Sequence, residues 1–225
     1  MIEVKNLVKN YGEGDVTTKV LRGINLSVRN GEFLGIMGRS GAGKSTLLYQ
    51  MSLLDVPTEG QIVIDSTDTA KLNEKERTDF RLHRLGYIFQ DYALLPELSA
   101  VENVVVELLM LGLPKRKAYE SARRALETVG LEHRLNNRPS QLSGGEQQRV
   151  SIARAVAENP DILFADEPTA NLDSVSGQSV IEVISNLHKH GQTVVMVTHE
   201  YEYTKDVDRI IHIEDGQIAK EEKLK

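Results

Sequence analysis

The sequence predicts an α/β fold in which parallel strands form the core and a helical subdomain is inserted among them. Segments at 33–37, 161–165 and 193–198 are almost entirely apolar, which is typical of strands buried on both faces of a parallel sheet. Segments typical of helices separate these strands along the chain. A mainly helical stretch at about 91–158 interrupts the alternation, so we expect a separate helical subdomain there.

In the first part of the chain, glycine and proline mark the boundaries of the expected elements. Partly alternating segments precede the buried strand at 33–37, and a glycine-rich turn leads from it into a helix. A Pro-Thr-Glu-Gly turn separates that helix from the next strand. The elements expected up to residue 90 are strands at 2–8, 26–29, 33–37, 61–65 and 87–90 and helices at about 45–54 and 73–85.

In the rest of the chain, two helix starts have the spacing of a capping box. Ser99 and Ser143 are each followed by a glutamate three residues later. Gly-Leu-Pro, Gly130, Asn-Pro and Gly191 end the helices. The expected elements are helices at about 99–112, 115–129, 143–157 and 175–190, strands at 161–165 and 193–198, and a hairpin of 210–213 and 217–219.

Composition excludes several classes of protein. The 225 residues include no cysteine, which rules out disulfides, thiolate metal sites and a cysteine nucleophile. A formal net charge of −6 argues against a chain that coats nucleic acid, so we expect no nucleic-acid partner. The apolar run at 104–113 is too short to span a membrane, and Met1–Lys5 lacks the features of a signal peptide. We therefore expect a cytoplasmic protein, with another chain supplying any membrane part.

The turn after the strand at 33–37 has the pattern G-x-x-x-x-G-K-S. Its glycines let successive backbone N–H groups point at phosphate oxygens, and the helix that follows adds its positive dipole end. Lys44 can reach the β- and γ-phosphates, and the Ser45 hydroxyl can bind Mg²⁺. The alternative is a glycine-rich turn without a ligand. The residues of this predicted phosphate loop are Gly38, Arg39, Ser40, Gly41, Ala42, Gly43, Lys44 and Ser45, with Thr46 next in the helix.

Two acids end the apolar strand at 161–165. Asp166 lies where ligands bind in open α/β sheets and is expected to hold Mg²⁺, through water. Glu167 would point to the opposite face if the strand continued. Pro168 indicates that the chain turns instead, which would let Glu167 face an attacking water as general base. The alternative is a pair of strand-end acids facing solvent.

The segment Leu-Ser-Gly-Gly-Glu-Gln at 142–147 opens a helix with small residues and the Ser143 hydroxyl. Exposed N–H groups at a helix start form a second anion site. One triphosphate held by Lys44 need not reach this second site within one chain. Two chains arranged head to tail would bring both sites to one nucleotide, since each chain closes the nucleotide that the other holds. The alternative is a simple helix cap.

Together these motifs resemble the ATPase domain of ABC transporters over essentially the whole chain. The resemblance implies a RecA-like P-loop NTPase core with an N-terminal antiparallel β subdomain, over 1–90 and 159–225, and a helical signature subdomain over 91–158. It also implies ATP and Mg²⁺ as cofactors, ATP hydrolysis, and a homodimer that encloses ATP. The expected location is the inner face of the cell membrane, beside an integral membrane permease.

The resemblance also implies roles for single residues. Glu167, Gln90 and His199 would be catalytic: Gln90 contacts Mg²⁺ and the attacking water, and His199 contacts the γ-phosphate. Mg²⁺ would be held by Ser45, Gln90 and Asp166. ATP would be bound by Tyr11, which stacks on adenine, by the phosphate loop from Gly38 to Thr46, and by Ser143, Gly144, Gly145, Glu146 and Asp173 across the dimer interface.

Three of these residues have plainer interpretations. Tyr11 can be an ordinary aromatic at a strand end, and His199 a structural histidine. Asp173 can cap the helix that follows, a role for which Ser174 also qualifies.

Residues 92–104 resemble the family branch of lipoprotein-releasing, macrolide-exporting and cell-division ATPases. In that branch this region faces the membrane subunit, so Leu94, Leu95 and Leu98 could form an apolar docking edge. The alternative is core packing of a loop.

The resemblance leaves several functions open. The first is a subunit that dimerises on ATP and powers a membrane-embedded permease, for lipoprotein release or for macrolide or peptide export. An ATPase that drives transmembrane mechanical signalling without transport is the alternative. Three further classes fit the sequence less well. A soluble DNA-repair ATPase usually carries long insertions, and a translation ATPase needs two cassettes in one chain. A P-loop kinase needs no second phosphate-binding helix.

Overall fold

The computed structural model describes residues 1–12 and 17–224. Packing divides the chain into two compact units, one comprising Met1–Arg81 with Gly191–Lys225 and the other Leu82–His190. The helical subdomain expected at 91–158 falls inside the second unit, which also contains the strands and the helix on either side of it. The bounds of that subdomain stay a prediction.

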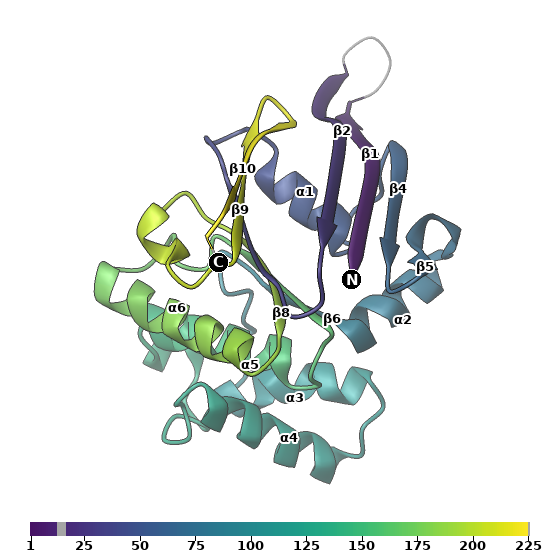
Figure 1. The fold of residues 1–225 in the computed structure, drawn as a ribbon. Coiled ribbons are helices and arrows are strands. Elements are labelled where there is room, and N and C mark those ends of the chain that lie inside the picture. The colour runs from purple at the N-terminus through teal and green to yellow at the C-terminus, as the bar shows by residue number, and fades with distance from the viewer. Residues whose placement is uncertain (13–16, 225) are drawn as a thin grey trace. The chain divides into compact units, whose positions relative to one another are not determined.

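In the first unit, an antiparallel sheet forms from the N-terminal third of the chain. Strand β1 (Ile2–Tyr11) lies between β2 (Thr18–Val28) and β4 (Glu59–Ile64), as Figure 1 shows, and β5 (Thr67–Asp68) pairs with β4. The expected antiparallel β subdomain is thus confirmed. Strand β2 begins well before the expected 26–29, because its first half pairs along β1 up to Tyr11 opposite Thr18.

The same unit contains the parallel strands that carry the glycine-rich turn. Strand β3 (Phe33–Met37) pairs in parallel with β8 (Thr193–Val197) and with β9 (Arg209–Glu214), and β9 pairs with β10 (Gln217–Lys223) as the expected antiparallel hairpin. Every residue of β3 and β8 is buried, which explains their continuous apolar sequence. Helix α1 (Lys44–Met51) is the next element after β3, and the glycine-rich turn joins the two.

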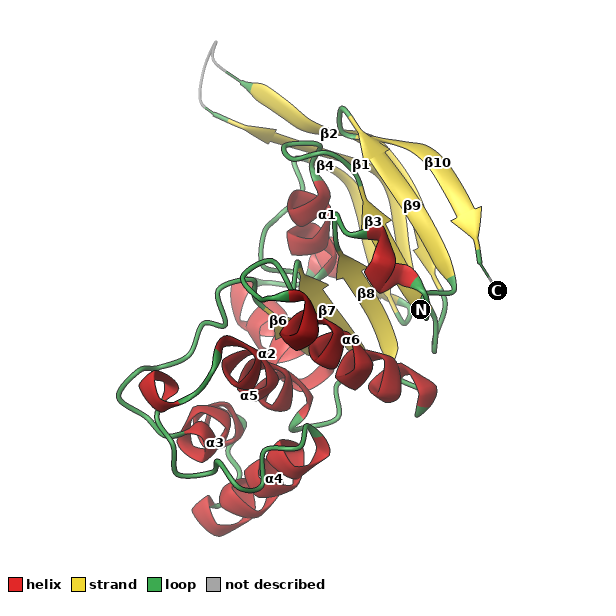
Figure 2. Ribbon diagram, turned by 90° about the vertical axis from the view of Figure 1, so that its left-hand side faces the viewer, coloured by secondary structure: helices red, strands yellow, loops and turns green. Residues whose placement is uncertain are grey.

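The second unit is mainly helical. Helices α3 (Ala100–Met110), α4 (Lys115–Thr128) and α5 (Gly144–Val156) pack together, as seen in Figure 2, and α6 (Ser174–Lys189) packs on α5. Strand β6 (Leu85–Ile88) pairs in parallel with β7 (Ile162–Asp166). The remaining elements are α2 (Glu74–Arg84), in which the division between the units falls, and short 3₁₀ helices at Thr69–Lys71, Pro139–Gln141 and Tyr201–Thr204, which the sequence did not indicate.

Both expected capping boxes are present. The Ser99 hydroxyl accepts the Glu102 N–H at 3.4 Å, and the Glu102 carboxylate accepts the Ser99 N–H at 2.8 Å. The same reciprocal pair forms between Ser143 and Glu146 at the start of α5. Each box satisfies backbone N–H groups that have no partner inside the helix.

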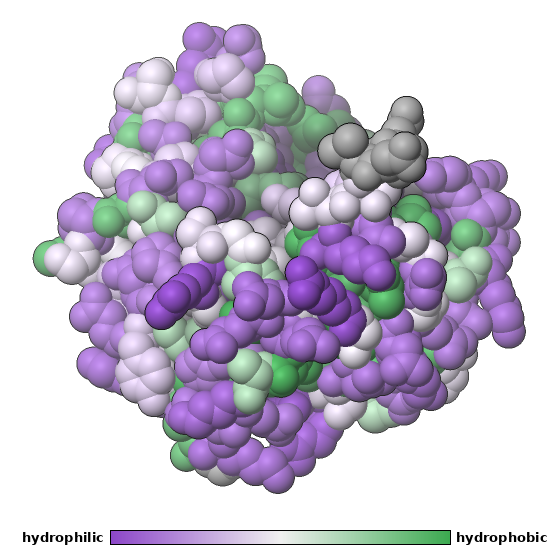
Figure 3. Space-filling model, turned by 90° about the horizontal axis from the view of Figure 1, so that it is seen from above, coloured by the Kyte–Doolittle hydropathy of each residue, from purple (hydrophilic) through white to green (hydrophobic). Residues whose placement is uncertain are grey.

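One face of the molecule is largely polar (Figure 3). Figure 3 shows a face on which hydrophilic residues dominate and hydrophobic residues form small, scattered groups. Among the described residues, no helix combines the length and the apolar character needed to span a membrane.

Candidate active site

The glycine-rich turn joins β3 to α1 and depends on three glycines that have positive φ angles. Gly38, Gly41 and Gly43 have φ angles of 152°, 77° and 101°. A Cβ on Gly38 would lie 2.3 Å from the backbone oxygen of Ile213, so this position excludes any side chain. Gly43 is the N-cap of α1 and offers no side chain to cap it. No side chain therefore caps the start of α1, as expected for a phosphate loop.

Lys44 is held within this loop. It is the first residue of α1 and is only 6% exposed. Its ammonium donates to the Arg39 backbone oxygen at 3.1 Å. The positive charge is therefore kept next to the loop's N–H groups. A cation and converging N–H donors are the groups that bind phosphate in P-loop proteins.

Two other predicted residues of the first unit lie at strand ends. Tyr11 is the last residue of β1 and is 43% exposed. His199 is exposed and follows the buried Thr198, which comes directly after β8. Their predicted roles in binding adenine and γ-phosphate stay predictions.

In the second unit, the predicted carboxylates lie where β7 ends. Asp166 is 5% exposed, and the Tyr87 hydroxyl donates to its Oδ2 at 3.4 Å. Glu167 has φ of 43°, and the Ala170 N–H donates to its carbonyl at 3.1 Å. The expected turn after Asp166 is confirmed, because a residue in the left-handed region cannot continue a strand.

The Leu-Ser-Gly-Gly-Glu segment begins α5 as expected, and tight packing explains its glycines. A Cβ on Gly144 would lie 3.0 Å from the Tyr92 hydroxyl, and one on Gly145 would lie 3.1 Å from the Ser176 Cβ. Glu146 accepts from the Ser143 N–H and from Arg134 Nε at 2.9 Å, and these bonds hold its pKa below the usual value. Glu146 thus orders this helix start within its own chain, whatever it contacts in a partner.

Asp173 caps α6. Its Oδ1 accepts the N–H groups of Val175 and Ser176 at 3.1 and 3.0 Å, and its Oδ2 accepts the Ser176 hydroxyl at 2.8 Å. The hydrogen bonds from Ser176, first its N–H and then its hydroxyl, lower the pKa of Asp173. Ser174, the other candidate, is the first residue of the helix. The predicted contact of Asp173 across a dimer interface stays a prediction.

The segment around Gln90 is held by side chains of α5 and of the loop after β7, which local sequence patterns did not reveal. Gln148, fully buried, donates to the Phe89 oxygen at 3.3 Å, and Asn171 donates to the Gln90 oxygen at 3.0 Å. Arg154 donates through both terminal nitrogens to Ala93 and Tyr92, at 2.5 and 3.1 Å. No motif spacing could have indicated these contacts, since they join residues far apart in sequence.

Arg154 holds an unusual turn. Tyr92 and Ala93 have φ angles of 63° and 49°, a conformation that is unfavourable for both residue types. Burial lowers the pKa of Arg154, whereas the nearby Glu107 and Asp91 carboxylates favour its charge. The guanidinium therefore offsets backbone strain that the turn would otherwise relieve by rearranging.

We expect Arg154→Lys to destabilise the protein by about 1–3 kcal/mol, because a single ammonium cannot replace two charge-assisted bonds to adjacent carbonyls. Urea unfolding measures the change through its midpoint. The matched control is Arg123→Lys, at an exposed position of α4, which should leave the midpoint unchanged. An equal midpoint for both variants would contradict this role of Arg154.

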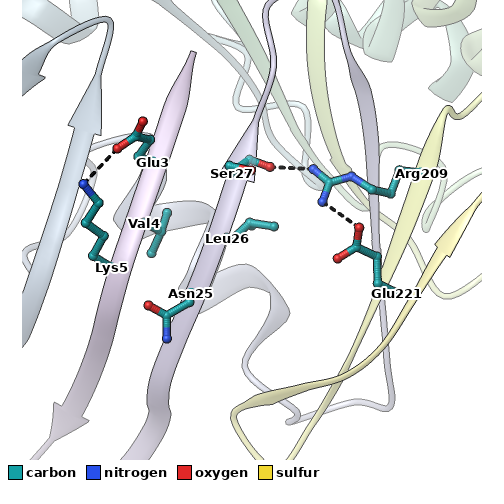
Figure 4. Close-up of a pocket in the computed structure, with 8 residues that line it drawn as sticks. All are labelled: Glu3, Val4, Lys5, Asn25, Leu26, Ser27, Arg209 and Glu221. Atoms are coloured by element: carbon teal, nitrogen blue, oxygen red, sulfur yellow. Dashed lines mark hydrogen bonds and ion pairs between the residues drawn. The ribbon is translucent and has the colours of Figure 1, made fainter.

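Figure 4 shows a groove of about 440 Å³ in the first unit that we do not assign to a ligand. Its charged side chains already engage each other: Lys5 with Glu3 at 2.9 Å, and Arg209 with Glu221 at 3.2 Å. Arg209 also donates to the Ser27 backbone oxygen. The groove is lined by Glu3, Val4, Lys5, Asn25, Leu26, Ser27, Arg209 and Glu221.

The fold and these features define a P-loop nucleotide-binding protein of the α/β class. A family model for ABC transporters matches residues 21–170. The chain therefore belongs to the ABC transporter family, and it is an ATPase of that family. The family resemblance and the fold class expected from the sequence are confirmed.

Several relatives match nearly the whole chain. It is 49% identical to an uncharacterized ABC transporter ATP-binding protein of Methanocaldococcus jannaschii, over 97% of this chain and 98% of that protein. It is 44% identical to the lipoprotein-releasing system ATP-binding protein LolD of Aquifex aeolicus, over 97% and 94%. The macrolide export ATP-binding/permease protein MacB of Aggregatibacter actinomycetemcomitans is 45% identical over 97% of this chain, which spans only 34% of that protein.

Solved structures show the same fold. The ATP-binding cassette MJ0796 in a dimeric post-hydrolysis state, bound to ADP and Pi, matches with a TM-score of 0.92 and 41% identity. The match covers 100% of this chain and 99% of the other. The branch suggested by residues 92–104 agrees with the LolD and MacB relatives.

Proposed function

We propose that this chain binds and hydrolyses ATP as a head-to-tail homodimer and thereby powers a membrane-embedded permease. The observation that carries the proposal is that one chain has two helix starts suited to phosphate, the uncapped α1 after Gly43 and the glycine-rich start of α5 at Ser143. The dimeric state of the similar cassette bound to ADP and Pi supports two copies as the working unit.

In this proposal the phosphate loop binds the triphosphate of ATP. Backbone N–H groups from Gly38 to Ser45 donate to its oxygens, and the Lys44 ammonium offsets negative charge on the β- and γ-phosphates. Tyr11 stacks on the adenine. Ser143 and its two glycines close the nucleotide held by the partner copy, with Asp173 beside them.

Hydrolysis requires a base and a place for Mg²⁺. Glu167 takes a proton from the attacking water, and Gln90 and His199 orient the water and the γ-phosphate. Ser45 and Asp166 offer hydroxyl and carboxylate oxygens, which are the donors Mg²⁺ prefers, and Asp166 is nearly buried. Mg²⁺ would neutralise charge that develops on the phosphates.

The names of two relatives support a class of permease. LolD and MacB are named for lipoprotein release and macrolide export, so we propose a permease of one of these types, with this chain at the inner face of the membrane. A cell-division-like role, in which ATP drives mechanical signalling without transport, is the alternative. A DNA-repair function is disfavoured by the net charge of −6.

Affinity purification from detergent-solubilised membranes tests the proposal. We expect the tagged chain to recover an integral membrane protein and that protein to raise its ATPase rate. Recovery of only DNA or ribosomes, with no membrane protein, would contradict a permease partner. Transport of a lipoprotein or macrolide by the reconstituted pair then separates transport from mechanical signalling.

The apolar segment before α3 is the proposed docking edge. Leu95 is 47% exposed, and Leu94 and Leu98 are half-buried, so none of the three lies in the core. The buried Asn103 amide fixes the segment by accepting the Leu95 N–H at 2.7 Å and donating to the Leu95 and Leu98 oxygens. The exposed Leu95 and the two half-buried leucines therefore lie on an ordered loop.

Changing Leu94, Leu95 and Leu98 together to alanine should spare basal ATPase activity and remove most stimulation by the permease. The physical reason is the loss of apolar surface at the contact, worth about 1.5–3 kcal/mol for each fully buried leucine. ATPase assays with and without the reconstituted permease measure the effect. Leu54→Ala, at another exposed leucine, is the control. Stimulation equal to that of the unmodified protein would remove the docking edge from the proposal.

A further inference from the structure

Tyr11 is held in place by hydrogen bonds and by a cation. Its hydroxyl donates to Asp55 Oδ2 at 2.7 Å. The Lys9 ammonium lies 4.7 Å from the centre of its ring. A tyrosine that only ended a strand would need neither contact, since the residue is 43% exposed.

Asp55 is itself fixed by several donors. Its Oδ1 accepts from Lys9 Nζ at 2.8 Å and from the Val56 N–H at 2.7 Å, and its Oδ2 accepts from Gln50 Nε2 at 2.9 Å. Partial burial alone would raise the pKa of Asp55, but the hydrogen bonds from Lys9 and Tyr11 outweigh it and lower the pKa. The carboxylate is therefore charged at neutral pH and keeps all these donors.

The tyrosine hydroxyl stays protonated under the same conditions. Burial, followed by the hydrogen bond to Asp55, raises the pKa of Tyr11 to about 12. The hydroxyl is thus a permanent donor to Asp55, and the pair does not switch in the physiological pH range.

These contacts connect the tyrosine to the helix that follows the phosphate loop. Gln50, which binds Asp55, lies in α1, and Thr46 in the first turn of α1 also interacts with the Tyr11 hydroxyl. Residues four apart share one face of a helix, so Thr46 and Gln50 present a single surface to this cluster. The position of the Tyr11 ring is consequently set relative to α1, the helix that Lys44 begins.

We propose that Asp55 and Lys9 are positioning residues that hold Tyr11 as a one-sided platform for the base of the nucleotide, at a set distance from the phosphate loop. The inference rests on the proposed ATP-binding function. Lys9 lies over one face of the ring, so in this proposal the purine stacks on the other face. Because the ring is ordered before the nucleotide arrives, binding loses less side-chain entropy.

The proposal separates base binding from phosphate binding. A platform acts only on ligands that carry a base, since stacking needs a second aromatic surface. Mg²⁺-tripolyphosphate has the phosphates of ATP and no base. A residue that acts through Tyr11 should therefore change the affinity for ATP and not the affinity for tripolyphosphate.

Isothermal titration of the full chain with each ligand tests this. We expect Tyr11→Phe and Asp55→Ala each to weaken ATP binding by about three- to tenfold, a part of the stacking contribution, and to leave tripolyphosphate affinity within about twofold. The double variant should bind ATP about as well as the weaker single variant, because both changes break the same support. In turnover, KM for ATP should rise while kcat stays unchanged.

A tyrosine far along the sequence from this cluster provides the control. Tyr119→Phe, a tyrosine of α4, should change neither affinity. Equal weakening of ATP and tripolyphosphate, additive effects in the double variant, or unchanged ATP affinity in Tyr11→Phe would each overturn the positioning role. Tyr11→Phe removes one oxygen, so it keeps the test decisive if Asp55→Ala does not fold. Failure of the unmodified protein to bind either ligand would instead overturn the proposed function.

Discussion

Lys44→Ala should abolish ATP turnover and weaken ATP binding by about 10- to 100-fold. The expected loss corresponds to roughly 1.5–3 kcal/mol for charge-assisted bonds to the phosphates. The buried ammonium lies against the loop's own backbone, so the substitution removes the positive charge from the place where the loop's N–H groups converge. Fluorescent-nucleotide titration and phosphate release measure the two effects.

The fold should survive this substitution, since Lys44 contributes a helix position for which alanine is at least as favourable. Circular dichroism and the melting temperature check that point. Lys75→Ala, at an exposed lysine of α2, is the matched control and should keep full activity. Unchanged turnover in Lys44→Ala would remove the phosphate loop from the catalytic site.

Glu167→Gln should preserve ATP binding, slow hydrolysis by about 10²- to 10⁴-fold, and trap an ATP-bound dimer. The range is that expected when a general base is lost. Glutamine keeps the size of the side chain, so the left-handed turn at φ 43° should persist. Light scattering with ATP reports the dimer, and single-turnover phosphate release reports the chemistry.

The two readouts of Glu167→Gln test different parts of the proposal. Rapid hydrolysis by the variant would show that another group is the base. A variant that stays monomeric with saturating ATP would contradict the enclosure of the nucleotide between two copies. Glu132→Gln, at an exposed glutamate, should hydrolyse ATP normally and is the control.

Local sequence signals predicted the order of the major elements because each depends on neighbouring residues. The continuous apolar run at Phe33–Met37 could be assigned to a buried strand, and the capping boxes at Ser99 and Ser143 to helix starts. The early start of β2 could not be assigned in this way. It depends on pairing with β1, and the segment from Thr18 has no clear alternation of its own.

The candidate site shows the same division. The phosphate loop, the acids after β7 and the start of α5 could be found from spacing, because their chemistry requires certain residue types at fixed offsets. Spacing could not reveal the Tyr11–Asp55 bond or the bonds from Arg154 to Tyr92 and Ala93. Their partners are separated by 44, 62 and 61 residues.

The sequence by itself determined the class of this protein, since a glycine-rich turn ending in Lys44 and Ser45, followed by Asp166 and Glu167, carries its chemistry locally. Only the tertiary structure decided how those residues are supported. It showed that Asp55 fixes Tyr11 and that Arg154 holds the turn after Gln90. The physical reason is that hydrogen bonds between distant segments depend on how the chain packs, and periodicity along the sequence does not encode that packing.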